Sequence, residues 1–456
     1  MPAPMQTWLP TPSQHFMWSA VAVLVYVLST RMRRERRPAT TAIAWVLGLA
    51  LVPYLALPLY LLFGQRKIRA APKAAVHAAA GDMHWAAALL GSFGIAPPSP
   101  AQIRFHADGL QARDALWECI DNARQQLDVC TFLIGRDSFG RDILERLERH
   151  ARRGVRVRLL LDGFGAWLSP RRPLRALQRA GAEVALFHPL VLGARRGPRN
   201  LRNHRKWVVA DGIRVWAGGR NLAAEYFVGR DGKAPWIDLT FDLTGEIAAV
   251  MAEQFQADWS SARGESAKPS QASPHGVLGP PAQFLPSGPD QAEDTAQALL
   301  VDACFRAEHR LLAVTPYFLP DDSLRTAMRL AARRRVSITI VLPAVSNHRL
   351  TDFVRSRALR DLAEAGAEIR LVPEMVHAKA VVVDDTLALC GSLNLDLRSL
   401  MLNYESAVLF YGAEQIEWLA SWIVALASRG TPFDRKPPGL LRDLAEGLLL
   451  AIAFEL

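Results

Sequence analysis

The segments HRKWVVAD (residues 204–211) and HAKAVVVD (residues 377–384) carry one pattern, His-x-Lys-x-x-x-x-Asp, twice in a chain of 456 residues. Each copy is followed, at the same spacing, by a turn of small residues: GGRN (residues 218–221) after the first and GSLN (residues 391–394) after the second. A single match to so loose a pattern is common by chance, but two copies with equal spacing to a second motif are not. The repetition indicates two related halves that contribute to one site.

The histidine and lysine of each copy are expected to project from the same face of a strand, because alternate residues of a β-strand share a side. If the halves pack about a pseudo-twofold axis, His204, Lys206, His377 and Lys379 meet in one cleft. Two histidines suit phosphoryl transfer, since one can attack phosphorus while the other handles the proton of the leaving group. The lysines can neutralise the anionic oxygens. We predict these four residues as the catalytic centre.

The two small-residue turns are predicted to bind the substrate phosphate. Gly219 and Ser392 allow the backbone and a ligand to approach closely, and Asn221 and Asn394 offer amide donors.

The last residue of each motif, Asp211 or Asp384, lies at a junction between a strand and a turn (ADG and DDT). We include both aspartates in the predicted catalytic set. A role in stabilising the turn is an equal alternative, because Asp is favoured in turns for its own local hydrogen bonds.

Each histidine also needs a carboxylate that holds its tautomer and stabilises its protonated form. Asp238 in WIDLTFD follows His204, and Glu405 in LNYESAVLF follows His377 at a similar offset. Each acid begins an apolar strand. We predict both as supporting residues, against the alternative of an ordinary acid at a strand end.

Alternating apolar strands and helical segments predict an α/β fold in both halves. The near-identical segments AGAEV (residues 180–184) and AGAEI (residues 365–369) stand at matching places and support an internal duplication. The predicted organisation is an N-terminal hairpin (1–70), a tether (71–100), a first α/β domain (101–261), a Pro/Ser-rich linker (262–290), a second α/β domain (291–430) and a helical tail (431–456). The tail is either a packed terminal helix or a helix that contacts a membrane.

Two apolar stretches, residues 16–30 and 39–64, precede the α/β domains and flank the Arg-rich segment RMRRERRP. We predict a transmembrane helical hairpin with its Arg-rich turn in the cytoplasm. A cleaved signal peptide is a poor alternative, because the basic residues follow the first apolar stretch. Two crossings would put the catalytic domains outside the cytoplasm, whereas Arg66, Lys67 and Arg69 beside the second stretch favour the opposite orientation.

The net charge of +10 favours an anionic partner, either nucleic acid or anionic lipid. Much of the basic excess lies in and beside the N-terminal hairpin, which would deliver the site to lipid, so we do not expect nucleic acid as a partner. The four cysteines are scattered without a CxxC pair and are expected to be buried apolar residues. The chain offers no clustered carboxylates with metal-ligand spacing, and no metal or other cofactor is predicted.

Longer segments around the motifs give the chain a resemblance to a known family. They are NHRKWVVADG with GGRNLAAEYF, LPSGPD, VTPYFLPD, and VHAKAVVVDD with GSLNLDLRSLMLNYE. With the N-terminal hairpin, these segments resemble the bacterial cardiolipin synthases of the phospholipase D superfamily from about residue 17 to the C-terminus. Two departures are visible: LAAEYF, where an acidic residue is expected before the glutamate, and the long linker.

The resemblance implies two tandem phospholipase D-like domains with pseudo-twofold symmetry behind a transmembrane hairpin. It implies a reaction through a phosphohistidine intermediate. It also implies that the protein is located in the bacterial inner (plasma) membrane. His204 would attack phosphatidylglycerol and expel glycerol, and His377 would act as acid and base. Attack by the hydroxyl of a second phosphatidylglycerol would give cardiolipin. Lys206 and Lys379 would neutralise the nonbridging oxygens, helped by Asn221 and Asn394.

Other functions share these motifs. A membrane phospholipase D that uses water or another alcohol as acceptor would carry the same residues, and a nucleic-acid phosphodiesterase is a more distant alternative. The acceptor, the side of the membrane and the oligomeric state stay open at this stage.

Overall fold

Strands from both halves of the chain form one continuous sheet in the computed structural model, which describes residues 10–33, 39–64, 66–67, 83–189, 200–266 and 276–452. The strands of the first half are β1 (Ser99–His106), β2 (Gln126–Thr131), β3 (Arg156–Asp162), β4 (Glu183–Phe187), β5 (Trp207–Ala210), β6 (Arg214–Gly218) and β7 (Thr240–Gly245). Those of the second half are β8 (Pro281–Ser287), β9 (Arg310–Val314), β11 (Ser337–Pro343), β12 (Glu368–Val372), β13 (Ala380–Val383), β14 (Leu387–Gly391), β16 (Glu405–Phe410) and β17 (Thr431–Pro432). Two short strands of the second half, β10 (Phe318–Leu319) and β15 (Leu395–Asp396), pair with each other in a separate sheet.

The strand order proves the duplication. Outward from the centre, the first half runs β1-β7-β6-β5-β2-β3-β4 and the second runs β8-β16-β14-β13-β9-β11-β12, with β17 added at the far edge. In both halves the three strands farthest out in these series are parallel to one another and the others are antiparallel. The halves meet where β1 pairs with β8 at Ser99 and Pro100. The predicted α/β fold with pseudo-twofold symmetry is confirmed.

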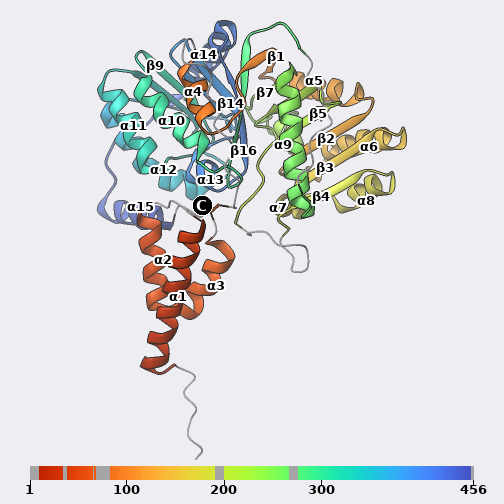
Figure 1. The fold of residues 1–456 in the computed structure, drawn as a ribbon. Coiled ribbons are helices and arrows are strands. Elements are labelled where there is room, and N and C mark those ends of the chain that lie inside the picture. Colours follow the sequence, from red (N-terminus) through yellow and green to blue (C-terminus); the bar gives the residue numbers. More distant parts are fainter. Residues whose placement is uncertain are drawn as a thin grey trace, which may run out of the picture.

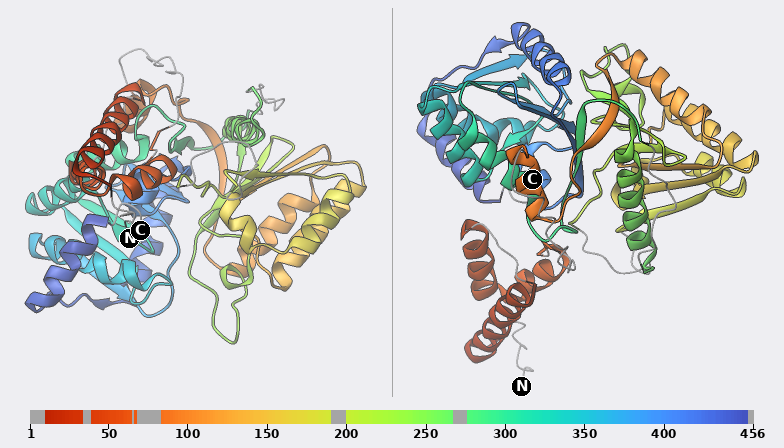
Figure 2. Two further views of the ribbon diagram at one scale, coloured as in Figure 1. Left: turned by 90° about the horizontal axis from the view of Figure 1, so that it is seen from below. Right: turned by 45° about the horizontal axis from the view of Figure 1, so that its top comes forward.

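Helices cover both faces of this sheet (Figures 1 and 2). The first half carries α5 (Gly109–Asp121), α6 (Ser138–Arg152), α7 (Gly163–Leu168), α8 (Arg171–Arg179), the 3-10 helix η1 (Ala224–Tyr226) and α9 (Glu246–Arg263). The second half carries α10 (Thr295–Arg306), α11 (Asp322–Arg333), α12 (Arg349–Ala365), α13 (Leu397–Met401), α14 (Ala413–Ser428) and α15 (Leu440–Ile452). Aspartate caps at positions 108, 137, 162 and 321 satisfy the first N–H groups of α5, α6, α7 and α11.

The N-terminal helices α1 (Pro12–Arg33), α2 (Ala39–Leu51) and α3 (Pro53–Phe63) project from the α/β body as a separate bundle (Figure 1). Among the described helices, α1 is the one that is long and apolar enough to cross a membrane. Residues 39–64, the second predicted membrane crossing, form two short helices and not one continuous helix. Proline at position 53 supplies no N–H to continue the helix, and Val52 leaves the helical region with φ −138° and ψ 58°.

The end of the predicted tether and both ends of the predicted linker differ from the boundaries in the structure. Residues 71–82 of the predicted tether (71–100) lie outside the described residues. Helix α4 (Trp85–Ser92) packs against α10 and β1 begins at Ser99, so the tether does not reach residue 100. The predicted linker is shorter too, because α9 runs to Arg263 and β8 begins at Pro281. Its residues 267–275 lie outside the described residues.

The C-terminal tail contains α15, which packs on α12. A buried ion pair joins Glu446 of α15 to Arg360 of α12. This contact agrees with the packed-helix alternative, while Leu440, Leu441 and Leu444 on the same helix are exposed.

Candidate active site

Backbone contacts between the halves bring the two motif histidines to the middle of the molecule. A parallel bridge joins Asn203 to Tyr404, and a second joins Ile237 to Val376. Through them, the backbone N–H of His204 donates to the carbonyl of Tyr404 at 2.9 Å, and that of His377 donates to Ile237 at 2.7 Å. Each motif therefore lies against a segment of the opposite half.

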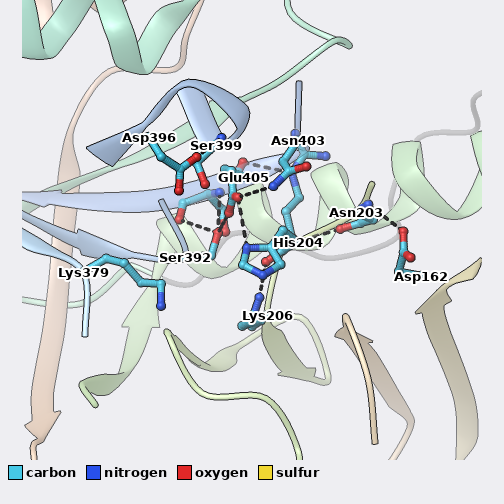
Figure 3. A network of polar contacts seen from close by, with 12 residues as sticks. Asp162, Asn203, His204, Lys206, Lys379, Ser392, Asp396, Ser399, Asn403 and Glu405 are labelled. Atoms are coloured by element: carbon cyan, nitrogen blue, oxygen red, sulfur yellow. Dashed lines mark hydrogen bonds and ion pairs between the residues drawn. The ribbon is translucent and has the colours of Figure 1, made fainter. Parts of the chain in front are cut away.

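This arrangement places Glu405 beside His204. The Nδ1 atom of His204 lies 3.0 Å from Oε1 of Glu405, a carboxylate with no exposed surface. The Ser392 hydroxyl donates to the same carboxylate, and the Asn403 amide donates to it at 3.2 Å. Figure 3 shows Glu405, Ser392 and Asn403 gathered on one side of the His204 ring, with Lys206 on the other.

The second histidine has an equivalent partner. The Nδ1 atom of His377 lies 2.7 Å from Oδ2 of Asp238, whose other oxygen accepts from the Leu239 backbone N–H at 2.7 Å. A Cβ atom at Gly219 would stand 2.2 Å from that oxygen, so the carboxylate requires a glycine there. Glu405 and Asp238, the two supporting acids predicted from the sequence, therefore each contact one motif histidine.

The pairing is crossed between the halves. The sequence offsets placed Asp238 with His204 and Glu405 with His377, and the structure reverses these partners. The physical reason is the pair of bridges described above: each acid follows a residue that pairs with the opposite motif, so its side chain reaches the opposite histidine.

Each lysine folds back on its own histidine. The Nζ atom of Lys206 donates to the His204 carbonyl at 2.7 Å, and Nζ of Lys379 lies 2.9 Å and 3.2 Å from the two ring nitrogens of His377. Burial lowers the pKa of Lys206 to about 7 and that of Lys379 to about 8. A bound phosphate would restore their charge, because an anion favours the protonated ammonium.

Burial also sets the protonation of the histidines. It lowers the pKa of His204, against the opposing charge of Glu405, and lowers the pKa of His377 to about 3. Burial alone would raise the pKa of Asp238, but His377 and Lys379 bring it to about 2. Both rings are therefore neutral beside ionised carboxylates. With Nδ1 bonded to the acid as donor, each Nε2 keeps a lone pair for attack or proton transfer.

Both histidines line one cavity of about 570 Å³ between the halves. Asn221 and Asn394 line it too, and the Oδ1 atom of each has no hydrogen-bond partner within the described chain. Gly219 and Ser392 are not part of the cavity wall; they contact the carboxylates of Asp238 and Glu405 instead. Lys206 and Lys379 stand outside the cavity wall as well, against the histidine that each contacts. Gly219 and Ser392 hold the two acids, and their binding of phosphate stays a prediction. Among the described residues, no group of three or more His, Cys, Asp or Glu side chains is placed to hold a metal ion.

A family model described as "Cardiolipin synthase, PLD-like domain" matches residues 116–259 and 300–426 of the chain. The chain belongs to this cardiolipin synthase family. A second model, "Phospholipase_D-nuclease N-terminal", matches residues 19–65. Cardiolipin synthase A of Pseudomonas putida (strain W619) is 32% identical over 90% of this chain and 91% of its own. Cardiolipin synthase A of Pseudomonas aeruginosa (strain LESB58) is 30% identical over 93% of this chain and 92% of its own.

A solved structure supports the fold of this synthase family member. The phosphatidylserine synthase of Haemophilus influenzae Rd KW20 superposes with a TM-score of 0.62 at 16% identity and covers 80% of this chain and 98% of its own. At that identity the likeness concerns the fold alone.

The aspartates of the synthase motif lie away from the catalytic centre. Asp211 follows β5 whereas His204 precedes it, a separation of roughly 20 Å along an extended strand. The Asp211 carboxylate accepts backbone N–H groups from residues 124, 125 and 126 at 2.8–2.9 Å. Asp384 does the same for residues 308, 309 and 310 at 2.8–3.0 Å. Their inclusion in the catalytic set is corrected: both anchor a loop before a strand of the neighbouring segment.

Two arginines of the synthase site were missed by sequence reasoning. Arg205 is fully buried, and its guanidinium bonds Asp258 of the first half and Asp290 of the second, which ties the halves together. Arg202 lines the cavity. The sequence NLRNHRK (residues 200–206) could have indicated both, because Arg202 stands two residues before His204 and Arg205 directly follows it.

Proposed function

We propose that this chain joins two phosphatidylglycerol molecules into cardiolipin with release of glycerol, through a phosphohistidine intermediate. The observation that carries the proposal is the pair of imidazoles on one cavity, each oriented by a carboxylate from the other half. Membership of the cardiolipin synthase family supports it.

We assign His204 as the nucleophile. Its side chain is 16% exposed against 5% for His377, and the Lys379 ammonium lies close to both ring nitrogens of His377. The greater access of the His204 ring supports attack by its Nε2 atom on phosphorus.

In the first step the bond between His204 Nε2 and phosphorus forms as the bond from phosphorus to the glycerol oxygen breaks. The anionic phosphodiester raises the pKa of the nearby imidazoles, so His377 can carry the proton that it gives to the departing glycerol. Lys206 and Lys379 neutralise the nonbridging oxygens, with Asn221 and Asn394 as further amide donors.

In the second step His377 removes the proton from the hydroxyl of a second phosphatidylglycerol. That oxygen attacks phosphorus, the nitrogen–phosphorus bond breaks, and His204 returns to its neutral form. The product is cardiolipin, and no proton is gained or lost over the two steps.

The substrate lies in a membrane, and we propose a bacterial plasma membrane as the site of action. The apolar surface of α1 and the phospholipid substrate support this location.

The test is product analysis of the purified protein with phosphatidylglycerol alone, together with lipid profiling after expression in a cardiolipin-deficient bacterium. We expect equal amounts of cardiolipin and glycerol. Phosphatidic acid as the sole lipid product would identify a hydrolase and overturn the proposal.

A further inference from the structure

Arg202 carries hydrogen-bond donors that point to a missing ligand. Its side chain lines the cavity and is 7% exposed. One terminal nitrogen donates to the His188 carbonyl at 3.0 Å and forms an ion pair with the buried Asp162 carboxylate at 3.4 Å. The Nε and Nη2 atoms have no hydrogen-bond partner within the described chain. Leaving cationic N–H groups buried and unpaired is costly, so an anion bound in the cavity would satisfy them.

Other polar groups share this part of the wall. Arg398 and Ser399 line the cavity, and the Ser399 hydroxyl has no hydrogen-bond partner in the described residues. The two guanidinium groups and the Ser399 hydroxyl can donate to an anion here, beside one acid in the cavity wall, Asp396.

The subsite occurs in one half only. Met375 occupies the position two residues before His377, where the first half has Arg202. Alternate residues of an extended chain share a side, so Arg202 stands beside His204, about 7 Å away along the chain. In the proposed mechanism Lys206 and Lys379 serve the transferred phosphate, so Arg202 is free to bind a second anionic group.

We propose that Arg202 binds the phosphodiester of the acceptor lipid. This role rests on the proposed function. In the product only a three-carbon glycerol bridge separates the two phosphate groups, so the acceptor phosphate must lie close beside the one that is transferred. A cation at this place favours an anionic lipid alcohol over water or a neutral alcohol.

The experiment offers the enzyme phosphatidylglycerol in detergent micelles with ethanol as a competing neutral acceptor. We expect Arg202→Gln to lower the ratio of cardiolipin to phosphatidylethanol roughly 10- to 100-fold, as the loss of a charge-assisted hydrogen bond predicts. Total transfer to ethanol should persist. Arg202→Lys should recover part of the ratio, and the control Lys206→Met should lower both products alike, because Lys206 serves the donor phosphate.

An unchanged ratio in Arg202→Gln would overturn the role of Arg202, as would an equal fall of both products in Arg202→Gln and Arg202→Lys proteins with wild-type thermal stability. A wild-type enzyme that forms phosphatidylethanol but never cardiolipin would instead overturn the proposed function.

A second inference concerns the N-terminal bundle. The Ser19 hydroxyl of α1 donates to the Ala50 carbonyl at the end of α2 at 2.8 Å, so α2 runs back along α1. The rings of Trp45 in α2 and Tyr60 in α3 lie 5.2 Å apart, although 15 residues of continuous helix would span about 22 Å. Tyr60 also contacts Tyr26 of α1 at 5.2 Å. The second apolar stretch is therefore a helical hairpin that returns to the side from which it started.

The hairpin is too short to cross a bilayer. Its first arm, α2, has 13 residues and is about 20 Å long, against about 33 Å for the 22 residues of α1 and about 30 Å for a hydrocarbon core. Its tip is apolar and exposed, with Leu51 at 68% and Val52 at 51%, and no charged residue occurs between positions 39 and 64. An uncharged apolar tip can lie in the hydrocarbon core of a membrane. The Ser19 hydroxyl donates a hydrogen bond to the Ala50 carbonyl, which lies close to the helix break at Pro53.

Both ends of the hairpin lie on the side of the catalytic body. The Phe63 carbonyl accepts from the Asn200 amide at 2.6 Å, and Lys67 lies 2.9 Å from Asp294. Arg31 and Arg33, which open the Arg-rich segment, stand at the same end of α1.

We infer that α1 crosses the membrane once, that α2 and α3 form a re-entrant hairpin, and that the catalytic body lies in the cytoplasm. Basic residues beside a span favour the cytoplasmic side, and the described ones, Arg31, Arg66 and Lys67, share one side. This topology rests on the proposed membrane location and replaces the two-span anchor.

Cross-linking tests the hairpin. A Cβ atom at Gly48 would stand 3.6 Å from Cβ of Ala56, within the range for a disulfide. Gly48→Cys/Ala56→Cys should form an intramolecular disulfide in oxidised membranes. The control Leu47→Cys/Leu55→Cys has the same spacing but exposed side chains and should not. Equal cross-linking of both pairs, or of neither, would overturn the hairpin.

Labelling tests the side of the membrane, because the four native cysteines are buried. In spheroplasts an impermeant maleimide should label Pro10→Cys, and should label Ser261→Cys on α9 only after permeabilisation. Labelling of Ser261→Cys from outside would overturn the topology. Release of the protein from membranes by high salt would instead overturn the membrane location.

Discussion

Replacing Glu405 by glutamine tests the crossed pairing of acids and histidines. The substitution keeps the size of the side chain but removes the charge that lies 3.0 Å from Nδ1 of His204. In the proposed mechanism His204 becomes positively charged as it attacks phosphorus, and Glu405 stabilises that charge. Asp238→Asn makes the matching change at His377 and serves as the control.

The size of the effect follows from the geometry. A hydrogen bond to a charged group contributes about 1.5–3 kcal/mol, and unit charges 4 Å apart at an effective dielectric constant of 20 interact by about 4 kcal/mol. Both Glu405 and His204 are shielded from water, so little of this is lost to screening. A loss of about 2–4 kcal/mol slows the attack of His204 roughly 30- to 1,000-fold.

The assay separates the two histidines by the leaving group. A phosphatidyl donor with p-nitrophenol in place of glycerol needs no proton for departure, so the first step depends on His204 alone. Glu405→Gln should slow the burst of p-nitrophenolate by the factor above. Asp238→Asn should leave the burst near the wild-type rate and slow the glycerol-releasing reaction with phosphatidylglycerol.

A normal burst in Glu405→Gln together with a lost burst in Asp238→Asn would refute the reasoning. Mass spectrometry of the trapped adduct then identifies the error. An adduct on His377 would reverse the roles of the histidines, and an adduct on His204 would show that the acids pair within their own halves.

Three further predictions follow from the site and its supports. Asp211→Asn should lower the free energy of unfolding by about 1–3 kcal/mol in chemical denaturation, because the carboxylate accepts three backbone N–H groups. The same substitution should leave kcat within about threefold of wild type. A large loss of kcat in folded protein would return Asp211 to the catalytic set. The pKa of His377 is lowered to about 3 from an ordinary 6.5, so the empty enzyme gains stability above pH 6.5 and loses it as the pH falls towards 3. The melting temperature of the wild type should fall as the pH is lowered from 6.5 to 3, and that of His377→Gln should fall less. An equal dependence of melting temperature on pH in the two proteins would contradict a neutral, buried His377 imidazole. A truncated chain beginning at Met83 keeps α4 and should retain activity on lipid in detergent but lose it on vesicles, and equal activity on vesicles at high salt would show that the anchor is not needed.

Local sequence was sufficient for the parts of this protein that repeat. The His-x-Lys pattern, the equal spacing to the turns and the AGAEV and AGAEI segments predicted two α/β halves with one site, because side-chain alternation along a strand is a local property. The four residues predicted as catalytic and the two asparagines were proposed in this way, and the structure brings both histidines and both asparagines to one cavity.

Tertiary structure alone decided which groups meet. The partner of each histidine depends on bridges between segments about 140 to 200 residues apart, which no spacing within a half encodes. Asp211 and Asp384 belong to the motif but point away from the site, because a strand carries residues seven positions apart to its opposite ends. The unpaired nitrogens of Arg202 and the fold-back at Pro53 likewise appear only when distant side chains pack together, since burial and contact are properties of the folded chain.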